Sequence, residues 1–282
     1  MPRSLAAPSP AAGIEDGLAA LELQYGAKVG FHGVNLNSGR TLDHNADDLF
    51  ATCSAFKTYV AGAILQKDQR GELRLTDPVY IDPAVFLPVA SPVTEPHLGG
   101  HLPLSELCAA AVRQSDNTAT NLMVGMLGGP AAITEFARSA GDVRTWMVRW
   151  EPELNSAYPG DPRDTTSPRG IGTGFLTMLT GTTIKGELLD EPHRALIDEW
   201  MSTIVTGDNR IRAGLPPGWN VADKTGTGDY ASTNDIGTAS GPNGERLLLA
   251  VMTRTRSDDP KAAALDGLIA DATRLVVPWL LA

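Results

Sequence analysis

The sequence predicts an α/β protein of the α+β sandwich type, in which an antiparallel sheet is flanked by helices and an all-helical region is inserted into the chain. Two observations favour this fold class. Strand-like segments lie near both ends of the chain, at residues 28–37 and 246–255. Between them, apolar residues recur at helical spacing in blocks that Pro and Gly separate. A sheet built from both ends of the chain around a helical insertion accounts for both observations.

The N-terminal elements follow from residue spacing and turn residues. Residues 1–12 are rich in Pro and Ala, and we expect a disordered lead-in there. Apolar residues at helical spacing predict an amphipathic helix over residues 14–26. Residues 28–37 alternate in hydropathy and run into an Asn-Ser-Gly turn signal, so residues 41–43 are expected to return as a second strand.

The rest of the chain has a helical middle and a β-rich end. A last helix, from about residue 260, has apolar residues on one face. We therefore divide the chain into an α/β part, residues 1–46 plus 207–282, and an all-helical part, residues 47–206. The expected helices of the middle are residues 54–67, 104–113, 117–127, 130–140, 173–180 and 192–206, and the expected C-terminal strands are residues 221–227, 233–240 and 246–255.

Composition excludes several classes of partner. Of the 282 residues, 42% are hydrophobic and 20% are charged, which are the proportions of a folded globular protein. The net charge of −10 argues against binding to nucleic acid or to an anionic membrane, because both need clustered Lys and Arg. A small anionic ligand can still bind in a local basic cleft. No apolar run reaches transmembrane length, and the N-terminal stretch MPRSLAAPSPAAG lacks the apolar core of a signal peptide.

Several residues that could suggest a disulfide, a metal or a cofactor have simpler interpretations. Cys53 and Cys108 are expected to be buried free thiols. His97 and His101 have two glycines between them, which places them in a loop, so we predict no metal site. The glycine-rich residues 170–174 follow a proline and not a strand, so they do not predict a phosphate-binding loop. We predict no cofactor.

The first chemical motif is Ser54-Ala55-Phe56-Lys57. On a helix, Ser and Lys three residues apart share one face, which places an amine beside a hydroxyl. A serine hydroxyl without help is a poor nucleophile at neutral pH, so a neighbouring proton acceptor is what a nucleophilic serine needs. The run after Lys57 is almost wholly apolar, and an ammonium at the start of a buried helix must be paired. By itself, the pattern also occurs on ordinary surface helices.

Two further motifs follow in the chain. Ser115-Asp116-Asn117 lies between two apolar helical stretches, where such a triplet is first of all a helix N-cap. Lys224-Thr225-Gly226-Thr227 lies on a predicted strand, where Gly lets a ligand approach the backbone and Lys supplies a charge for an anionic group. Each motif is ordinary alone, but their occurrence together in this order is not.

With a fourth motif, the chain resembles the class A β-lactamases, for which the first three motifs are characteristic. Residues 149–155 are Arg-Trp-Glu-Pro-Glu-Leu-Asn, and with the Asp-Pro-Arg-Asp of residues 161–164 they are similar to the family's omega loop, here about residues 149–164. The resemblance covers nearly the whole chain. It implies hydrolysis of β-lactam antibiotics through an acyl-enzyme, with the active site at the junction of the two parts of the chain.

The resemblance also implies catalytic roles. Ser54 matches the nucleophile and Lys57 its neighbouring proton acceptor. Ser115 matches the serine that relays a proton to the departing β-lactam nitrogen. Glu151 and Asn155 match the residues that hold the water for hydrolysis of the acyl-enzyme. Whether Lys57 or Glu151 takes the serine proton during acylation stays open.

The same resemblance implies a substrate-binding set. Asn117 matches the side chain that holds the acylamide of the substrate. Lys224 and Thr225 would face the substrate carboxylate, and Gly226 allows close approach to the strand. The backbone N–H groups of Thr227 and of the nucleophile would form the oxyanion hole.

The chain also departs from the family pattern. Many members have an Arg shortly after the Lys-Thr-Gly strand, where this chain has Thr233. Arg210 stands where some relatives have a substitute arginine, and we expect it to help hold the substrate carboxylate. Ala90 stands where an aromatic residue often flanks the site. Gly228 and Ala61 occupy positions where some relatives have the second cysteine of a disulfide, so neither disulfide is expected.

Two other functions share part of this pattern. A penicillin-binding transpeptidase or carboxypeptidase has the first three motifs but generally lacks the loop with Glu151 and Asn155. A penicillin sensor is acylated and stays acylated, and has no use for a poised water. For the hydrolase, the expected partners are small-molecule β-lactam substrates and inhibitors, and the chain is expected to be a monomer. Export to the periplasm, cell envelope or medium is expected, because the family's substrates act on the cell envelope.

Overall fold

A five-stranded antiparallel sheet organises the molecule. The computed structural model describes residues 10–183 and 186–282. Segments from the two ends of the chain meet in the β1–β11 pair, where Phe31 lies opposite Val251. The predicted fold class, with a sheet built from both ends of the chain, is therefore confirmed. In spatial order the strands are β2 (Thr41–His44), β1 (Ala27–Asn35), β11 (Arg246–Thr255), β10 (Thr233–Ser240) and β9 (Asn220–Thr227).

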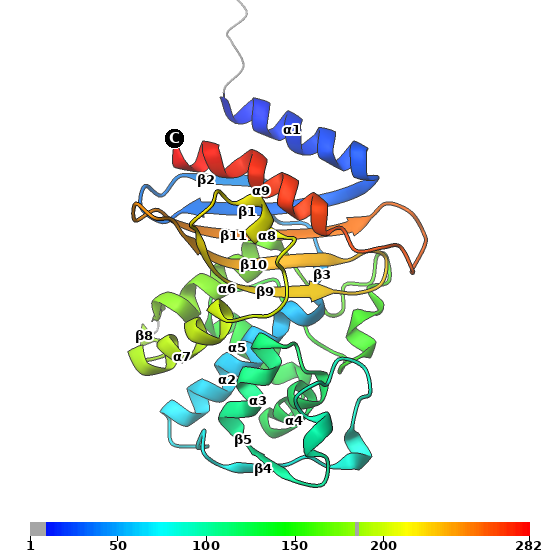
Figure 1. Ribbon diagram of the computed structural model, residues 1–282, viewed down its shortest axis with the longest axis vertical. Coiled ribbons are helices and arrows are strands. Elements are labelled where there is room, and N and C mark those ends of the chain that lie inside the picture. The colour runs from blue at the N-terminus through cyan, green and yellow to red at the C-terminus, as the bar shows by residue number, and fades with distance from the viewer. Residues whose placement is uncertain (1–9, 184–185) are drawn as a thin grey trace, which may run out of the picture.

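Helices cover both faces of this sheet (Figure 1). On one face lie α1 (Pro10–Tyr25), α9 (Asp266–Leu281) and the short α8 (Ile211–Gly214). On the other face, α6 (Pro168–Thr180) contacts β1, β10 and β11, and α7 (Glu191–Ser202) contacts β9. Because both faces are covered, residues 247–253 of β11 are all buried, which explains the unbroken apolar run Leu-Leu-Leu-Ala-Val-Met in that strand.

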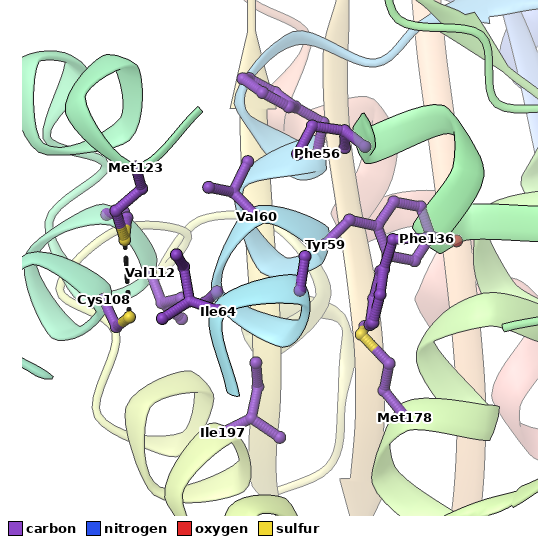
Figure 2. Close-up of a cluster of buried hydrophobic side chains, with 14 of the residues drawn as sticks. Phe56, Tyr59, Val60, Ile64, Cys108, Val112, Met123, Phe136, Met178 and Ile197 are labelled. Atoms are coloured by element: carbon purple, nitrogen blue, oxygen red, sulfur yellow. Dashed lines mark hydrogen bonds between the residues drawn. The ribbon is translucent and has the colours of Figure 1, made fainter. Parts of the chain in front are cut away.

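A single helix, α2 (Lys57–Gln69), forms the centre of the helical region (Figure 2). Its first nine residues are all buried, as expected for a helix surrounded by other helices. Tyr59 makes edge-to-face contacts with Phe136 and Phe175, and its hydroxyl donates to Asp142 at 2.8 Å. Around α2 lie α3 (Leu104–Arg113), α4 (Asn117–Leu127), α5 (Pro130–Ser139) and α7 (Glu191–Ser202).

Short elements connect the sheet to the helices. The two-residue strands β3 (Phe50–Ala51) and β6 (Thr165–Thr166) pair with each other, which brings the end of the 149–164 loop beside the segment that leads to Ser54. Ser54 itself lies in a 3-10 turn, η1 (Cys53–Phe56), which precedes α2. The other short elements are β4 (Pro78–Tyr80), η2 (Pro83–Val85), η3 (Glu95–His97), β5 (His101–Pro103), η4 (Glu153–Ser156), β7 (Thr182–Thr183) and β8 (Gly186–Glu187).

The predicted elements are present, but several boundaries differ. Residues 10–12 form the first turn of α1 and not part of a disordered lead-in, whereas residues 1–9 lie outside the described residues. The helix predicted over residues 173–180 begins at Pro168, because Ser167 accepts a hydrogen bond from Gly170 N and Pro fits the first helical turn.

Three other predicted helices are also shorter or shifted. The helix expected at residues 54–67 starts as the 3-10 turn η1. The helix expected at residues 192–206 ends at Ser202, and the last helix starts at Asp266 and not near residue 260. Apolar spacing locates a helix better than its ends, because the ends depend on individual hydrogen bonds.

Other sequence expectations have mixed outcomes. Cys53 and Cys108 are buried and free, as predicted. Across the two described ranges, no helix is both long and apolar enough to span a membrane. The division into residues 1–46 plus 207–282 and residues 47–206 stays a prediction.

We predict that His193 makes the stability of the fold pH-dependent. It joins α7 to α2 by hydrogen bonds from Nδ1 to Asp190 at 2.5 Å and from Nε2 to Asp68 at 2.8 Å. Burial opposes protonation, but the hydrogen bonds to Asp68 and Asp190 outweigh it and raise the pKa of His193. The stabilisation is therefore complete below a pH of about 6.5, the pKa of an unfolded histidine, and is lost as pH rises through the folded-state pKa.

Thermal unfolding of His193→Gln between pH 5.5 and pH 9 tests this. The melting temperature of the variant should fall below that of the native protein at the acidic end, and the gap should narrow as pH rises. A gap that is constant over this range would show that His193 is not charged in the fold.

Candidate active site

The predicted site residues converge on one cavity of about 580 Å³. It lies where the edge strand β9, the turn η1, the Ser115 segment and the 149–164 loop meet. Eight of the predicted residues line it, and Lys57, Glu151 and Lys224 are buried next to them. The eight are Ser54, Ser115, Asn117, Asn155, Arg210, Thr225, Gly226 and Thr227.

Ser54 follows a backbone turn that differs from an ordinary helix start. Cys53 has a positive φ of 43°, which is uncommon for a residue with a side chain and turns the chain sharply into η1. The half-buried Ser54 then faces the cavity. Its Oγ donates to Glu151 Oε1 at 3.5 Å. Within the described residues, Ser54 Oγ has no hydrogen bond to Lys57 Nζ.

Lys57 is a fully buried ammonium at the start of α2. Its Nζ donates to the Ser115 carbonyl at 2.7 Å and to Asn117 Oδ1 at 2.5 Å, and lies 3.1 Å from Glu151 Oε1. Burial lowers the pKa of Lys57, although the Glu151 carboxylate opposes the shift. The buried ammonium thus has the partners that its position in an apolar helix requires. Its lowered pKa suits a group that exchanges protons.

A second buried lysine lies on β9. Lys224 Nζ donates to Ser115 Oγ at 3.2 Å and to the Thr225 carbonyl at 3.0 Å. Ser115 Oγ also lies 3.3 Å from Lys57 Nζ, so one hydroxyl bridges the two ammonium groups. Burial and the neighbouring Lys57 lower the pKa of Lys224 to about 7.

The Ser-Asp-Asn triplet is both a helix cap and part of the site. Asp116 caps α4 by accepting from Ala119 N at 2.8 Å. Its carboxylate also accepts from the backbone N–H groups of Val93 and Thr94, each at 3.0 Å. The Asp116 carboxylate therefore fixes both the start of α4, beside Ser115, and the segment at residues 93–94. Lys57 holds the neighbouring Asn117 side chain.

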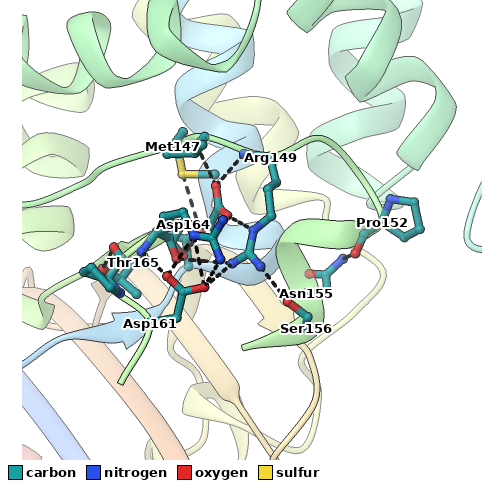
Figure 3. A network of polar contacts seen from close by, with 12 residues as sticks. Met147, Arg149, Pro152, Asn155, Ser156, Asp161, Asp164 and Thr165 are labelled. Atoms are coloured by element: carbon teal, nitrogen blue, oxygen red, sulfur yellow. Dashed lines mark hydrogen bonds and ion pairs between the residues drawn. The ribbon is translucent and has the colours of Figure 1, made fainter. Parts of the chain in front are cut away.

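The 149–164 loop is closed by an ion pair (Figure 3). Arg149 Nε donates to Asp164 Oδ2 at 2.5 Å, and Arg149 Nη1 donates to Ser156 Oγ at 2.9 Å. Asp164 is fully buried and also accepts from the backbone N–H of Val148 at 2.7 Å. The two ends of the loop are thus tied at a single carboxylate.

This loop holds Glu151 over Ser54. Asn155 Nδ2 donates to Glu151 Oε2 at 2.5 Å. Asn121 holds the Glu151 backbone from α4, by donating to its carbonyl at 2.8 Å and accepting from its N–H at 3.1 Å. Sequence reasoning missed Asn121, although its position one turn after Asn117 on the same helix face was a usable signal.

Arg210 reaches the site from the segment before α8. Its Nη2 donates to Thr227 Oγ1 at 2.7 Å, and its Nη1 donates to the carbonyls of Gly226 and Asn234. Thr233 is buried, and its hydroxyl donates to the Ala231 carbonyl, away from the site. The only arginine that lines the cavity within the described residues is therefore Arg210.

A pair of buried acids lies beside Lys224, and sequence analysis did not single it out. Asp223 and Asp235 are both fully buried and lie on the adjacent strands β9 and β10. Burial raises the pKa of both carboxyl groups, and the neighbouring Asp235 raises that of Asp223 further. Asp223 also binds Arg212, and Asp235 accepts from Ile211 N at 3.1 Å. The pair thus anchors the segment that follows Arg210.

The remaining expectations can be placed as well. A Cβ at Gly228 would lie 2.7 Å from Cys53 Sγ and 2.7 Å from the Asn155 carbonyl, so a glycine fits this crowded position. Ala90 lines the mouth of the cavity. In the parts of the chain that the structure describes, no group of three or more His, Cys, Asp or Glu side chains is placed to hold a metal ion.

The site has the parts of a serine hydrolase, since a serine at a cavity wall contacts a carboxylate that is itself paired with a buried amine. The sequence profile of the β-lactamase enzyme family matches residues 13–278. A β-lactamase of Streptomyces albus G is 42% identical over 268 residues, which are 93% of this chain and 83% of that one. The chain belongs to the β-lactamase enzyme family, in class A.

Solved structures agree with this assignment. A β-lactamase from Desulfarculus baarsii DSM 2075 superposes with a TM-score of 0.91 at 42% identity, covering 98% of this chain and all of the other. A variant of the ancestral class A β-lactamase of Gram-negative bacteria has a TM-score of 0.89 at 40% identity, covering 95% of this chain and 98% of its own.

We predict that Asp164→Asn destabilises the fold by about 3 kcal/mol, because it removes the nearer of the two carboxylates that pair with the largely buried Arg149 guanidinium. The melting temperature should fall by several degrees, and protease should cut within residues 149–164. Asp161→Asn is the matched control, because its contact to Arg149 is longer, at 3.5 Å, and it should cost about 1 kcal/mol or less. Equal melting temperatures for the two variants would contradict the role of Asp164.

Proposed function

We propose that the protein hydrolyses β-lactam antibiotics through an acyl-enzyme on Ser54, with deacylation by a water that Glu151 activates. The observation that supports this most is the position of the Glu151 carboxylate, 3.5 Å from Ser54 Oγ and 3.1 Å from Lys57 Nζ. A carboxylate held over the nucleophile can activate a water that attacks the acyl carbon. A protein that is acylated and stays acylated does not need such a group.

In the acylation step, Ser54 Oγ attacks the β-lactam carbonyl carbon and loses its proton to Glu151 or to Lys57. The Oγ–C bond forms and the C–N bond of the ring breaks. The N–H groups of Ser54 and Thr227 hold the oxygen as it becomes negative. Ser115 Oγ, which lies between Lys57 and Lys224, relays a proton to the departing nitrogen. Glu151 Oε1 contacts both Ser54 Oγ, at 3.5 Å, and Lys57 Nζ, at 3.1 Å, so the proton can reach either base through this oxygen.

In the deacylation step, a water attacks the ester carbon and gives its proton to Glu151, the C–Oγ bond breaks, and Glu151 returns the proton to Ser54 Oγ. Asn155 supports this step in two ways. Its Nδ2 fixes the Glu151 carboxylate, and its buried Oδ1 has no protein partner within the described residues, which makes it an acceptor for a water O–H.

Substrate binding uses the opposite wall. Lys224, Thr225 and Arg210 surround the part of the cavity in which we place the substrate carboxylate. Arg210 acts beside Thr227, whose hydroxyl it holds. Asn117 Nδ2 points to the Val89 carbonyl at 3.0 Å and has a second N–H for the acylamide of the substrate.

The two alternatives, a penicillin-binding transpeptidase and a penicillin sensor, differ from this proposal in turnover. The hydrolase should consume a coloured cephalosporin many times over, whereas either alternative would consume one molecule per protein. The geometry of Glu151 and Asn155 favours the hydrolase.

We predict that Glu151→Ala slows deacylation at least about 10³-fold, because it removes both the general base and the group that positions the water. Acylation should survive, because Lys57 is a second candidate base. Intact-protein mass spectrometry should then show one added penicillin mass on Ser54. Glu153→Ala is the control, since Glu153 lies exposed in the same loop and lines the same cavity, and it should turn over normally.

Two results would contradict this assignment. Turnover of Glu151→Ala at the native rate would exclude Glu151 as the base for deacylation. A variant that never acylates would make Glu151 the essential base of the first step, and Lys57 would then have another role.

We also predict that Arg210→Ala lowers kcat/KM about 10- to 100-fold, because a charge-assisted hydrogen bond contributes roughly 1.5–3 kcal/mol. Arg256→Ala is a suitable control, because it removes a 2.6 Å ion pair with Glu22 on α1 and does not touch the cavity. A loss of less than threefold for Arg210→Ala, with the protein folded, would exclude Arg210 from carboxylate binding.

A further inference from the structure

One buried amide on β10 contacts the backbone just before the nucleophile. Asn234 is fully buried, and its Nδ2 donates to the carbonyls of Ala51 at 2.8 Å and Thr52 at 3.0 Å. Both partners are carbonyl oxygens, so this end of the side chain must be the NH₂ group. Its Oδ1 has no hydrogen-bond partner within the described residues. Within the described residues, the Asn234 side chain therefore donates hydrogen bonds and accepts none.

The backbone that Asn234 holds determines where Ser54 lies. Thr52 also donates its N–H to the Asp164 carbonyl at 2.9 Å and accepts from Ala55 N at 3.1 Å. Cys53, between Thr52 and Ser54, has a positive φ of 43°. A residue with a side chain keeps such a conformation only when its surroundings enforce it. The two hydrogen bonds from Asn234 are part of that enforcement, and they act directly before the Ser54 N–H.

The same residue also contacts the other half of the site. On β10, Asn234 lies opposite Gly226 of β9, next to the pair formed by Thr233 and Thr227. A Cβ at Gly226 would lie 2.8 Å from the Thr52 carbonyl. The backbones of β9 and of the segment before Ser54 are therefore so close that no side chain fits between them at this position. In addition, the Asn234 carbonyl accepts from Arg210 Nη1 at 2.7 Å. One residue thus joins the nucleophile segment, the strand that includes Thr227, and Arg210.

We propose that Asn234 is a positioning residue for acylation, which sets the spacing between the Ser54 N–H and the Thr227 N–H. The proposal rests on the acyl-enzyme function proposed above, in which these two groups hold the developing oxyanion. Donors stabilise an oxyanion only within a narrow range of distance, so a small shift of Ser54 against β9 lowers the rate of ring opening. Asn234 touches neither the cavity nor the substrate, and acts through Ser54.

The test measures ring opening of a coloured cephalosporin in single turnover, with enzyme in excess over substrate. Asn234→Ala should open the ring at least about tenfold more slowly than the native protein at saturating enzyme. The enzyme concentration that gives half of the maximal rate should change by less than threefold. Asn35→Ala is the matched control. It removes a buried amide from the same sheet, one that donates to the Leu280 carbonyl at 2.9 Å, far from the cavity. It should lower the melting temperature and leave the ring-opening rate unchanged.

A second variant separates positioning from mere structural support. In Asn234→Asp, an ionised carboxylate faces two carbonyls and cannot donate, whereas the protonated acid can donate one hydrogen bond. The ratio of the variant's ring-opening rate to the native rate should therefore rise at least about threefold between pH 8 and pH 5.5.

Two results would overturn the inference. One is an Asn234→Ala rate within threefold of the Asn35→Ala rate at a temperature where both are folded. The other is a flat pH ratio for Asn234→Asp. The function proposed for Ser54 is tested separately: if Ser54→Ala opens the ring as fast as the native protein, the acyl-enzyme proposal fails whatever the Asn234 variants do.

Discussion

The site depends on one physical constraint, the burial of the Lys57 ammonium at the start of the central helix. A charge without access to water must be compensated by partners, and no residue of α2 itself can supply them. The partners come from distant parts of the chain: a carbonyl at Ser115, an amide at Asn117 and a carboxylate at Glu151. Compensating this charge therefore brings the helical wall and the 149–164 loop to the same point above Ser54.

A second buried ammonium group, that of Lys224, lies next to the first. Lys224 approaches from the sheet, and the two ammonium groups share the Ser115 hydroxyl. Burial lowers the pKa of both lysines, and the Lys57 ammonium lowers the pKa of Lys224 further, while the Glu151 carboxylate opposes both shifts. Both lysines therefore release a proton more readily than an exposed lysine does. Sheet and helices each contribute one lysine, so the pair exists only where the two are docked.

Sequence reasoning succeeded where local patterns determine the outcome. Apolar spacing located the helices and strands, and the order of four motifs located the residues that line the cavity. It failed where hydrogen bonds between distant segments decide. Asp223 and Asp235 form a buried acid pair only because two adjacent strands bring them together. Asn234 looks like an ordinary strand residue until the fold places it against Thr52.

The strand order has a consequence for how the chain is made. β11 is the central strand of the sheet, yet nearly all of the chain precedes it, and β1 pairs with it from the opposite end of the sequence. During synthesis on the ribosome, β1 can pair with β2 early but must wait for its other neighbour until residues near 255 have emerged. Closure of such a long loop makes folding slow and leaves an unpaired strand edge in the nascent chain. The finished sheet, and with it Lys224 and Thr227, forms only as a late and cooperative event.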